Sequence, residues 1–282
     1  MKGDGGRIGC DEVINIFEEL KEIGFEDLDK VDLFPPKSKE SEKEIENTKK
    51  KFTVEEVLYD KTYICPVCNK EFKSKAIRSG KNRLLTVDLD LKANYDIVNP
   101  LLYECVVCEN CGYAALSKTF NSLTSSQIRW IKEQIGTKYK EYHYPPILSE
   151  KDGILRYKLT LLNSFVKKAK DGEKAYICLK LAWLYRDIKE KAAEEVFLQH
   201  ALTGFENAYN TERFPIFELG ELTTAYIIAD LYRRKKNYEK AMQWLGFVIM
   251  DKSVSLRLKT KALHLKGIIN EERREIEERE IE

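Results

Sequence analysis

Apolar residues recur every three or four positions along most of the chain after residue 119, the spacing of a helix that buries one face. The same pattern occurs earlier over residues 11–23, where Gly24 suits a C-cap. Thr124 to Gln127 has the spacing of a capping box before another such stretch. Further helices are predicted at about residues 150–169, 173–187, 191–209, 216–235, 238–251 and 254–278. Because their connections are short, we expect consecutive helices to form antiparallel pairs.

The middle of the chain has a strand-like pattern instead. Polar and apolar residues alternate strictly from Val87 to Leu91, which predicts a strand. The run from Leu101 to Val107 predicts a second strand after a turn at Asn99-Pro100. Asp88 and Asp90 share one face of the first strand. Two such carboxylates can bind a metal or perform acid–base chemistry, but we interpret them as a charged outer face.

Composition divides the chain further. After Pro35-Pro36, residues 37–51 hold one large apolar residue, Ile45, among Lys, Glu and Ser. This stretch buries too little surface to offset the entropy of ordering, which predicts a flexible linker. The predicted division is an N-terminal helical segment (1–34), a charged linker (35–58), a β module (59–120), a connecting helix and loop (121–149) and a helical domain (150–282).

One helix pair in the last domain has a more specific pattern. Between Ala225 and Val248, small residues fall where two helices cross closely and tyrosines fall at the helix junctions, as in a tetratricopeptide repeat (TPR). Lys174 to Tyr185 is similar to the first helix of such a repeat. An ordinary helical bundle with alanines at its contacts is the alternative. The predicted fold class is α+β, mostly α: a small zinc-ribbon-like β module followed by a TPR-like helical domain.

The zinc prediction depends on four of the seven cysteines, which form the C-x-x-C pairs Cys65/Cys68 and Cys108/Cys111. At this spacing two thiolates on one turn reach the same ion, and four thiolates close a tetrahedral Zn²⁺ shell. Gly112 suits the second turn because it adopts positive φ without strain. We predict a structural Zn²⁺ that pins two distant strands together.

Other chemistries use some of the same residues. Cys105 extends the second pair to C-x-x-C-x-x-C, a run that can bind an iron–sulfur cluster. Because positions 105 and 108 of a strand point to opposite faces, we interpret Cys105 as a core residue. A redox role for Cys65 and Cys68 would favour a helix directly after the pair, and no strong helix pattern follows. Cys178 is predicted in the core, and Cys10 as a free thiol.

Charge and hydropathy limit the partners. The chain has 282 residues and a net charge of +1, which argues against a general attraction to nucleic acid or anionic membranes. It has no apolar run of about 18 residues, the length of a membrane span. Its N-terminus lacks the apolar stretch of a signal peptide. Together with the cysteine pairs, this predicts a reducing, cytoplasmic location.

The segment around the cysteines resembles a known family. The motifs that carry the likeness are Tyr59 to Cys68, Asp88 to Leu91 and Cys108 to Ala115, followed by Arg156 to Leu159 and Leu179 to Arg186. They are similar to the bacterial family known as domain of unknown function 2225 (DUF2225), over about residues 59–250. The resemblance implies a cytoplasmic zinc site with helical repeats, and it implies no activity. Glu109 stands where that family usually has Pro, which leaves the ligand spacing intact.

A basic run beside the first cysteine pair offers an alternative function. Zinc ribbons often use such surfaces to bind nucleic acid, but Phe72 is the one aromatic residue near this run for base stacking. We favour a solvated loop whose charge is offset by nearby aspartates. The run consists of Lys70, Lys73, Lys75, Arg78, Lys81 and Arg83.

No motif predicts an enzyme. The three histidines, His143, His200 and His264, are scattered, and no glycine-rich phosphate loop is present. We therefore predict a non-enzymatic scaffold whose helical domain offers a groove for a peptide or helix of a partner protein. A nucleic-acid-binding module and a metal-dependent or redox enzyme are the alternatives. The exposed residues expected to line the groove are Tyr226, Tyr232, Arg233 and Arg234.

Overall fold

The computed structural model describes residues 52–281. The predicted helix at 11–23, Cys10 and the linker up to residue 51 lie outside the described residues. Phe52–Glu282 forms one compact unit, and the predicted boundaries at 120/121 and 149/150 fall within it.

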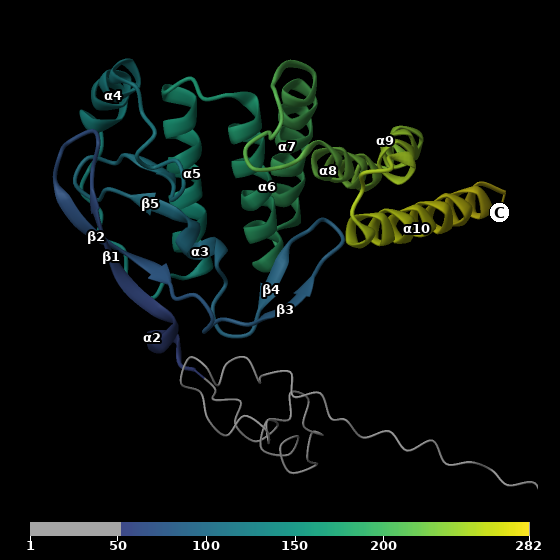
Figure 1. Cartoon of the computed structure of the whole chain (residues 1–282), viewed down its shortest axis with the longest axis horizontal. Coiled ribbons are helices and arrows are strands. Elements are labelled where there is room, and N and C mark those ends of the chain that lie inside the picture. The colour runs from purple at the N-terminus through teal and green to yellow at the C-terminus, as the bar shows by residue number, and fades with distance from the viewer. Residues whose placement is uncertain (1–51, 282) are drawn as a thin grey trace, which may run out of the picture. The chain divides into compact units, whose positions relative to one another are not determined.

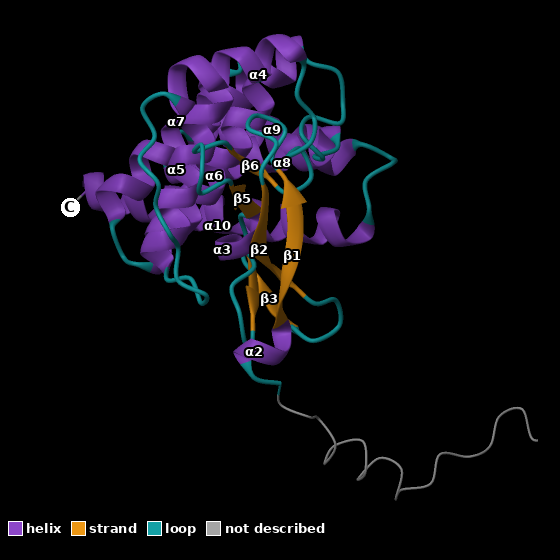
Figure 2. Cartoon of the chain, turned by 90° about the vertical axis from the view of Figure 1, so that its left-hand side faces the viewer, coloured by secondary structure: helices purple, strands orange, loops and turns teal. Residues whose placement is uncertain are grey.

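Within the described part of the chain, the β structure consists of three antiparallel hairpins (Figure 1, Figure 2). β1 (Leu58–Ile64) pairs with β2 (Glu71–Ile77) along its whole length. β3 (Leu84–Val87) pairs with β4 (Ala93–Tyr95), and β5 (Cys105–Val107) pairs with β6 (Ala114–Leu116).

The end of the predicted linker is structured. A capping box formed by Thr53 and Glu56 starts the short helix α2 (Val54–Val57), which leads directly into β1. Val57 is fully buried and Leu58 nearly so. Residues 53–58 therefore belong to the folded unit, contrary to the prediction, because Val57 and Leu58 are buried in the core and Val54 packs against it.

The two predicted strands are correct only in part. β3 ends at Val87, and the chain then turns back, with the Asp88 N–H donating to the Lys92 carbonyl over 2.8 Å. The predicted strand at 101–107 begins instead as the short helix α3 (Leu101–Glu104) before β5. The Asn99 side chain accepts from the Leu101 N–H at the start of this helix. An apolar run this short fits either a helix or a strand by periodicity alone.

The remainder is helical, so the predicted mostly α, α+β class is confirmed. The capping box at Thr124 and Gln127 starts α4 as predicted, and a π-helical turn, η3, follows it. Six longer helices then pack each against the next (Figure 1). Residues 216–220 precede α8 rather than belonging to it. The bounds are α4 (Ser125–Ile131), η3 (Lys132–Gly136), α5 (Glu150–Val166), α6 (Asp171–Asp187), α7 (Lys191–Thr211), α8 (Glu221–Arg234), α9 (Tyr238–Met250) and α10 (Leu256–Ile281).

Two predictions concern these helices: their likeness to tetratricopeptide repeats and the lack of a membrane-spanning segment. The likeness to tetratricopeptide repeats stays a prediction, since successive packing is common to many helical folds. Among residues 52–281, no helix is both long enough and apolar enough to cross a membrane.

Two clusters of buried apolar side chains hold the unit together. The larger cluster joins the hairpins to the helices, because it contains Leu102 and Cys105 as well as Tyr157 and Leu184. The smaller cluster surrounds the C-x-x-C cysteines and includes side chains from β5 to α5, among them Val106, Tyr113, Phe120, Ile131 and Val166.

Asp90 is buried, which overturns its assignment to a charged outer face. Its carboxylate lies 2.7 Å from Arg186 and 3.2 Å from Arg234, and it accepts from the Trp183 indole N–H over 2.9 Å. These partners come from α6 and α8, so the β3–β4 turn is fastened to two helices. Burial raises the pKa of Asp90, but the hydrogen bond and charge of Arg186, with the charge of Arg234, outweigh it and leave the pKa lowered.

Candidate metal centre

The two C-x-x-C turns have the same backbone. In each, the first cysteine donates its N–H to the carbonyl five residues on, and its own carbonyl accepts from the N–H four residues on, over 2.8–3.0 Å. The residue after the second cysteine is left-handed in both turns: Asn69 has φ 59° and Gly112 has φ 73°. Asn and Gly are the residues that adopt this conformation most readily. Local sequence therefore shapes each turn before the two meet.

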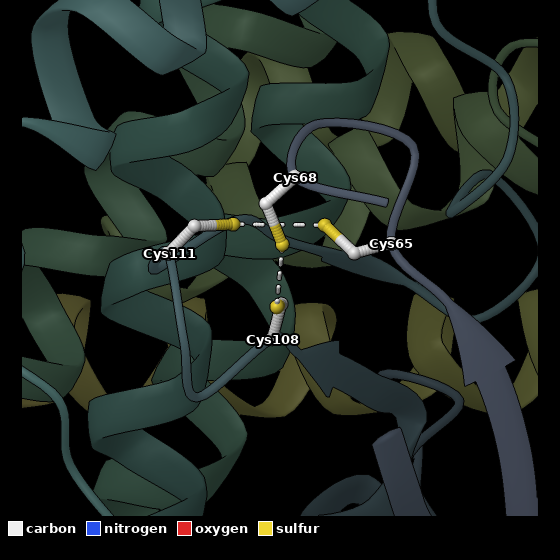
Figure 3. Close-up of side chains that lie close together, drawn as sticks. All are labelled: Cys65, Cys68, Cys108 and Cys111. Carbon is white, nitrogen blue, oxygen red and sulfur yellow. Dashed lines mark hydrogen bonds between the residues drawn. The ribbon is translucent and has the colours of Figure 1, made fainter. Parts of the chain in front are cut away.

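The four sulfurs converge on one point (Figure 3). Cys65 Sγ lies 3.6 Å from Cys111 Sγ, and Cys68 Sγ lies 3.7 Å from Cys108 Sγ. All four sulfurs lie within 4.8 Å of one another. The prediction that these two distant turns come together is confirmed.

These separations fit a single metal ion. With Zn–S bonds of about 2.3 Å, neighbouring sulfurs of a regular tetrahedron lie about 3.8 Å apart. A disulfide would require sulfurs about 2.05 Å apart, so the four thiols are not paired with each other. The cluster can hold one ion in an all-sulfur shell with no position left for water.

The thiols influence one another strongly. The nearby sulfurs of Cys111 and Cys65 lower the pKa of the Cys108 thiol. The same contact with Cys108 raises the pKa of Cys65, to about 12, and that of Cys111. A metal ion binds cysteines as thiolates, so its binding releases the protons of the thiols and weakens as the pH falls.

Residues far along the chain support the second turn. The Gly112 carbonyl accepts from the Asn163 side-chain amide of α5 over 3.0 Å. The Tyr139 ring covers Gly112 so closely that a Cβ there would lie 2.4 Å from it. Sequence reasoning identified Gly112 from its place after the pair. It missed Asn163 and Tyr139, because nothing in their local sequence links them to the cysteines.

Glu109, the residue between the cysteines that departs from the family pattern, makes its own contacts. Its carboxylate accepts from the Tyr144 N–H over 3.1 Å and lies 2.7 Å from His143 Nδ1. This contact raises the pKa of His143. The second turn is therefore tied to the loop before α5, and His143 takes part in a surface contact rather than in a catalytic group.

The other two cysteines of the described chain lie outside the cluster. Cys105 and Cys178 are buried in the larger core, and burial raises the pKa of both thiols to about 12. The interpretation of both as core residues is confirmed. The sulfur cluster includes neither of them.

Most of the predicted basic run is engaged with the chain itself. Lys75 lies 2.9 Å from Asp60, and Arg83 lies 3.5 Å from Asp96. The cations of Arg78 and Lys81 lie over the rings of Tyr59 and Phe52, and Lys70 contacts the Asn110 side chain. Lys73 is exposed and lines a small pocket described below. Nucleic-acid binding by this run stays an untested alternative.

The residues predicted to line a partner groove are not freely exposed. Tyr226 is fully buried and its hydroxyl donates to the Leu89 carbonyl, while Tyr232 is 5% exposed. Arg233 and Arg234 both pair with Asp230. The expected exposure of these four residues is therefore wrong, since α8 is packed between neighbouring helices and the β3–β4 turn.

Fold and site together define a mainly helical α+β protein with a buried four-cysteine cluster. The chain belongs to the family described as "Uncharacterized protein conserved in bacteria (DUF2225)", whose sequence model matches residues 58–269. A relative described as an uncharacterized protein, from Borreliella burgdorferi, is 28% identical over 127 residues, which cover 42% of this chain and 41% of the relative. The chain thus matches about two fifths of that curated relative's length. No solved structure is significantly similar to this chain.

Proposed function

We propose that this protein is a cytoplasmic zinc protein that acts as a non-enzymatic scaffold and binds a partner protein. The observation that carries the proposal is the closed shell of four sulfurs. A catalytic zinc keeps one position for water or substrate, whereas a shell of four thiolates serves folding. The metal's role is then to hold the β1–β2 and β5–β6 turns together.

Zinc is the metal that fits this shell best. A compact tetrahedral set of thiolates suits Zn²⁺ or an iron centre. A multi-iron cluster is several atoms wide and would hold its cysteines further apart than a single ion does. The six cysteines among residues 52–281 are all free thiols, which supports a reducing compartment.

The partner site that the side chains favour is a groove between α7 and α9, with α8 beneath it. The groove has a volume of about 430 Å³ and is lined by Tyr209, Trp244 and Phe247, with Tyr232. The Tyr209 and Trp244 rings meet edge to face with centroids 4.7 Å apart, and Phe247 is 42% exposed. Tyr209 and Trp244 are half-buried, and aromatic side chains that line a groove in this way are frequent binding hot spots. We assign the groove to a peptide segment that carries a large apolar anchor side chain.

Polar groups at one wall would orient such a peptide. The Tyr232 hydroxyl contacts Glu206, and Lys240 Nζ lies 3.2 Å from the same hydroxyl. Both charged side chains line the groove. A groove with an aromatic wall and one acid and one base beside it suits a peptide better than nucleic acid, whose phosphates would meet Glu206.

Native mass spectrometry of the purified full chain tests the metal. We expect one zinc ion per chain, removed by a strong chelator with unfolding or aggregation of the unit. Iron in place of zinc, or folded protein without metal, would overturn the assignment.

Peptides selected from a random library on the zinc-loaded protein test the groove. Phe247→Asp should weaken their binding at least about 30-fold, the loss of a hot-spot residue. Val196→Asp, at a position on α7 that is 54% exposed and outside the groove, is the control and should leave binding unchanged. Selected peptides that bind both variants equally well would locate the partner site elsewhere.

A further inference from the structure

A pocket beside the cysteine cluster contains a buried arginine without an ion-pair partner. The pocket has a volume of about 310 Å³ and lies between β2, α5 and the loop before α5. Its lining includes Lys73, Ser74 and Lys75 from β2, Tyr144 from the loop and Arg156 from α5. We call it the Arg156 pocket.

Arg156 is only 5% exposed. Its Nη2 donates to the Ser74 hydroxyl over 3.3 Å and to the Cys105 carbonyl, and its Nε is buried without a hydrogen-bond partner. Among residues 52–281, no carboxylate lies within 4 Å of its guanidinium. Removing a charge from water is costly unless an opposite charge compensates it.

The other buried cations of the described chain are paired, which sets Arg156 apart. Lys92 and Lys167 are 6% and 5% exposed, and they pair with Asp187 and Glu173. The less buried arginines of α6 and α8 also reach carboxylates, at 2.7–2.9 Å. For Arg156 the face of Tyr144, 5.0 Å from the guanidinium carbon, offers partial compensation.

The pocket's own carboxylates are engaged elsewhere. Asp60 pairs with Lys75, and Glu109 contacts His143 and the Tyr144 N–H. Lys73 is exposed and forms no ion pair with another described residue. The cations left without a carboxylate in this pocket are therefore Arg156 and Lys73.

We propose that the Arg156 pocket binds an oxyanion, the phosphate or carboxylate group of a small ligand. The anion supplies the ion pair that Arg156 lacks, Lys73 adds a second charge, and the Ser74 hydroxyl a further hydrogen-bonding group. The apolar wall formed by Tyr144, Pro145 and Leu148 accommodates the rest of the ligand. This binding is independent of the peptide groove and uses no metal.

Titration of the full chain at constant ionic strength tests the proposal, with sodium phosphate and sodium acetate as probes and sodium chloride as reference. The readout is the side-chain Nε–H resonance of Arg156 in ¹⁵N-arginine-labelled protein, together with calorimetry. We expect a saturable shift of this resonance with phosphate, with acetate or with both, and the responding probe identifies the anion class. No shift beyond that in chloride would overturn the proposal.

Variants distinguish an Arg156 that binds an anion from an Arg156 that only stabilises the fold. Lys73→Ala, at an exposed position, should weaken binding about tenfold, because a charge-assisted contact is lost. Lys61→Ala removes the same charge from the same hairpin outside the pocket and should change binding less than twofold. Arg156→Lys should abolish anion binding, provided that this variant folds. If it does not fold, the result for Lys73→Ala decides the proposal. Equal losses in Lys73→Ala and Lys61→Ala would indicate general electrostatic attraction and overturn the site.

Discussion

Three hairpin turns of the described chain are held in place by buried clusters, two by cysteine sulfurs and one by an ion-pair cluster. The turns of β1–β2 and β5–β6 meet through the four cysteines, whereas the β3–β4 turn inserts Asp90 between Arg186 and Arg234. Both clusters are buried and polar. They differ in what completes them: the sulfur shell would be completed by a metal ion from outside, and the Asp90 cluster is neutralised by residues of the chain itself.

Because of this difference, each connection should fail under a change that leaves the other one intact. Loss of metal should loosen the two cysteine turns and leave the β3–β4 turn in place. Loss of the Asp90 charge should free the β3–β4 turn and leave the metal bound. Variants in each cluster can therefore break one connection at a time.

Replacing a cysteine should have the largest effect. Cys108→Ser removes one of four ligands, and we expect the bound zinc to be lost and the free energy of unfolding to fall by several kcal/mol. Structural zinc contributes about 10–16 kcal/mol to the folding of small zinc-finger peptides, so even partial loss is large. Elemental analysis and thermal unfolding of the purified variant measure both quantities.

Cys178→Ser is the matched control, since Cys178 is a buried thiol outside the cluster. It should destabilise the protein modestly and retain the metal. Full zinc occupancy in Cys108→Ser would show that the four sulfurs do not share an ion.

Replacing Asp90 should have the next largest effect. Asp90→Asn leaves two partly buried guanidinium groups without this carboxylate and should destabilise the unit by about 3–5 kcal/mol. Asp88→Asn is the control, because the Asp88 carboxylate is only partly buried and contacts the Asn94 amide rather than a cation. We expect a change below about 1 kcal/mol there, measured by urea unfolding with zinc in excess. Equal effects of the two substitutions would contradict the role assigned to Asp90.

A pH series gives an independent check on Asp90. Since its pKa is lowered in the folded protein, its contribution is present above the ordinary carboxyl pKa and is lost as the pH falls through the folded value. The difference in stability between the wild type and Asp90→Asn should therefore shrink on acidification. A difference that stays constant down to acid unfolding would argue against an ion pair.

Replacing Gly112 should have a smaller effect on stability. It tests whether the close contact with Tyr139 constrains the second cysteine turn. Gly112→Ala combines a left-handed conformation with a clash against the Tyr139 ring. Gly80→Ala has a similar φ, 79°, and open space around the new Cβ, so it measures the conformational part alone. We expect Gly112→Ala to cost about 1–3 kcal/mol more than Gly80→Ala in thermal unfolding experiments. Equal costs would mean that Tyr139 moves aside freely.

The sequence by itself determined the helices and the composition of the cysteine cluster. Helical periodicity placed α5 to α10 within a few residues at most ends, because each buries a continuous face against its neighbours. The C-x-x-C spacing and the left-handed residue that follows are local, so Cys65, Cys68, Cys108 and Cys111 could be predicted from four short stretches.

Only the tertiary structure decided whether each isolated charged residue is buried and which charged groups it meets. Asp90 meets Trp183 and Arg234, which lie 93 and 144 residues away along the chain, and no local pattern links them. Arg156 likewise differs from a surface arginine only through the burial imposed by β2 and β5. Whether a charge lies in water or against an opposite charge depends on which elements pack around it, and alternation along one strand carries no information about that packing.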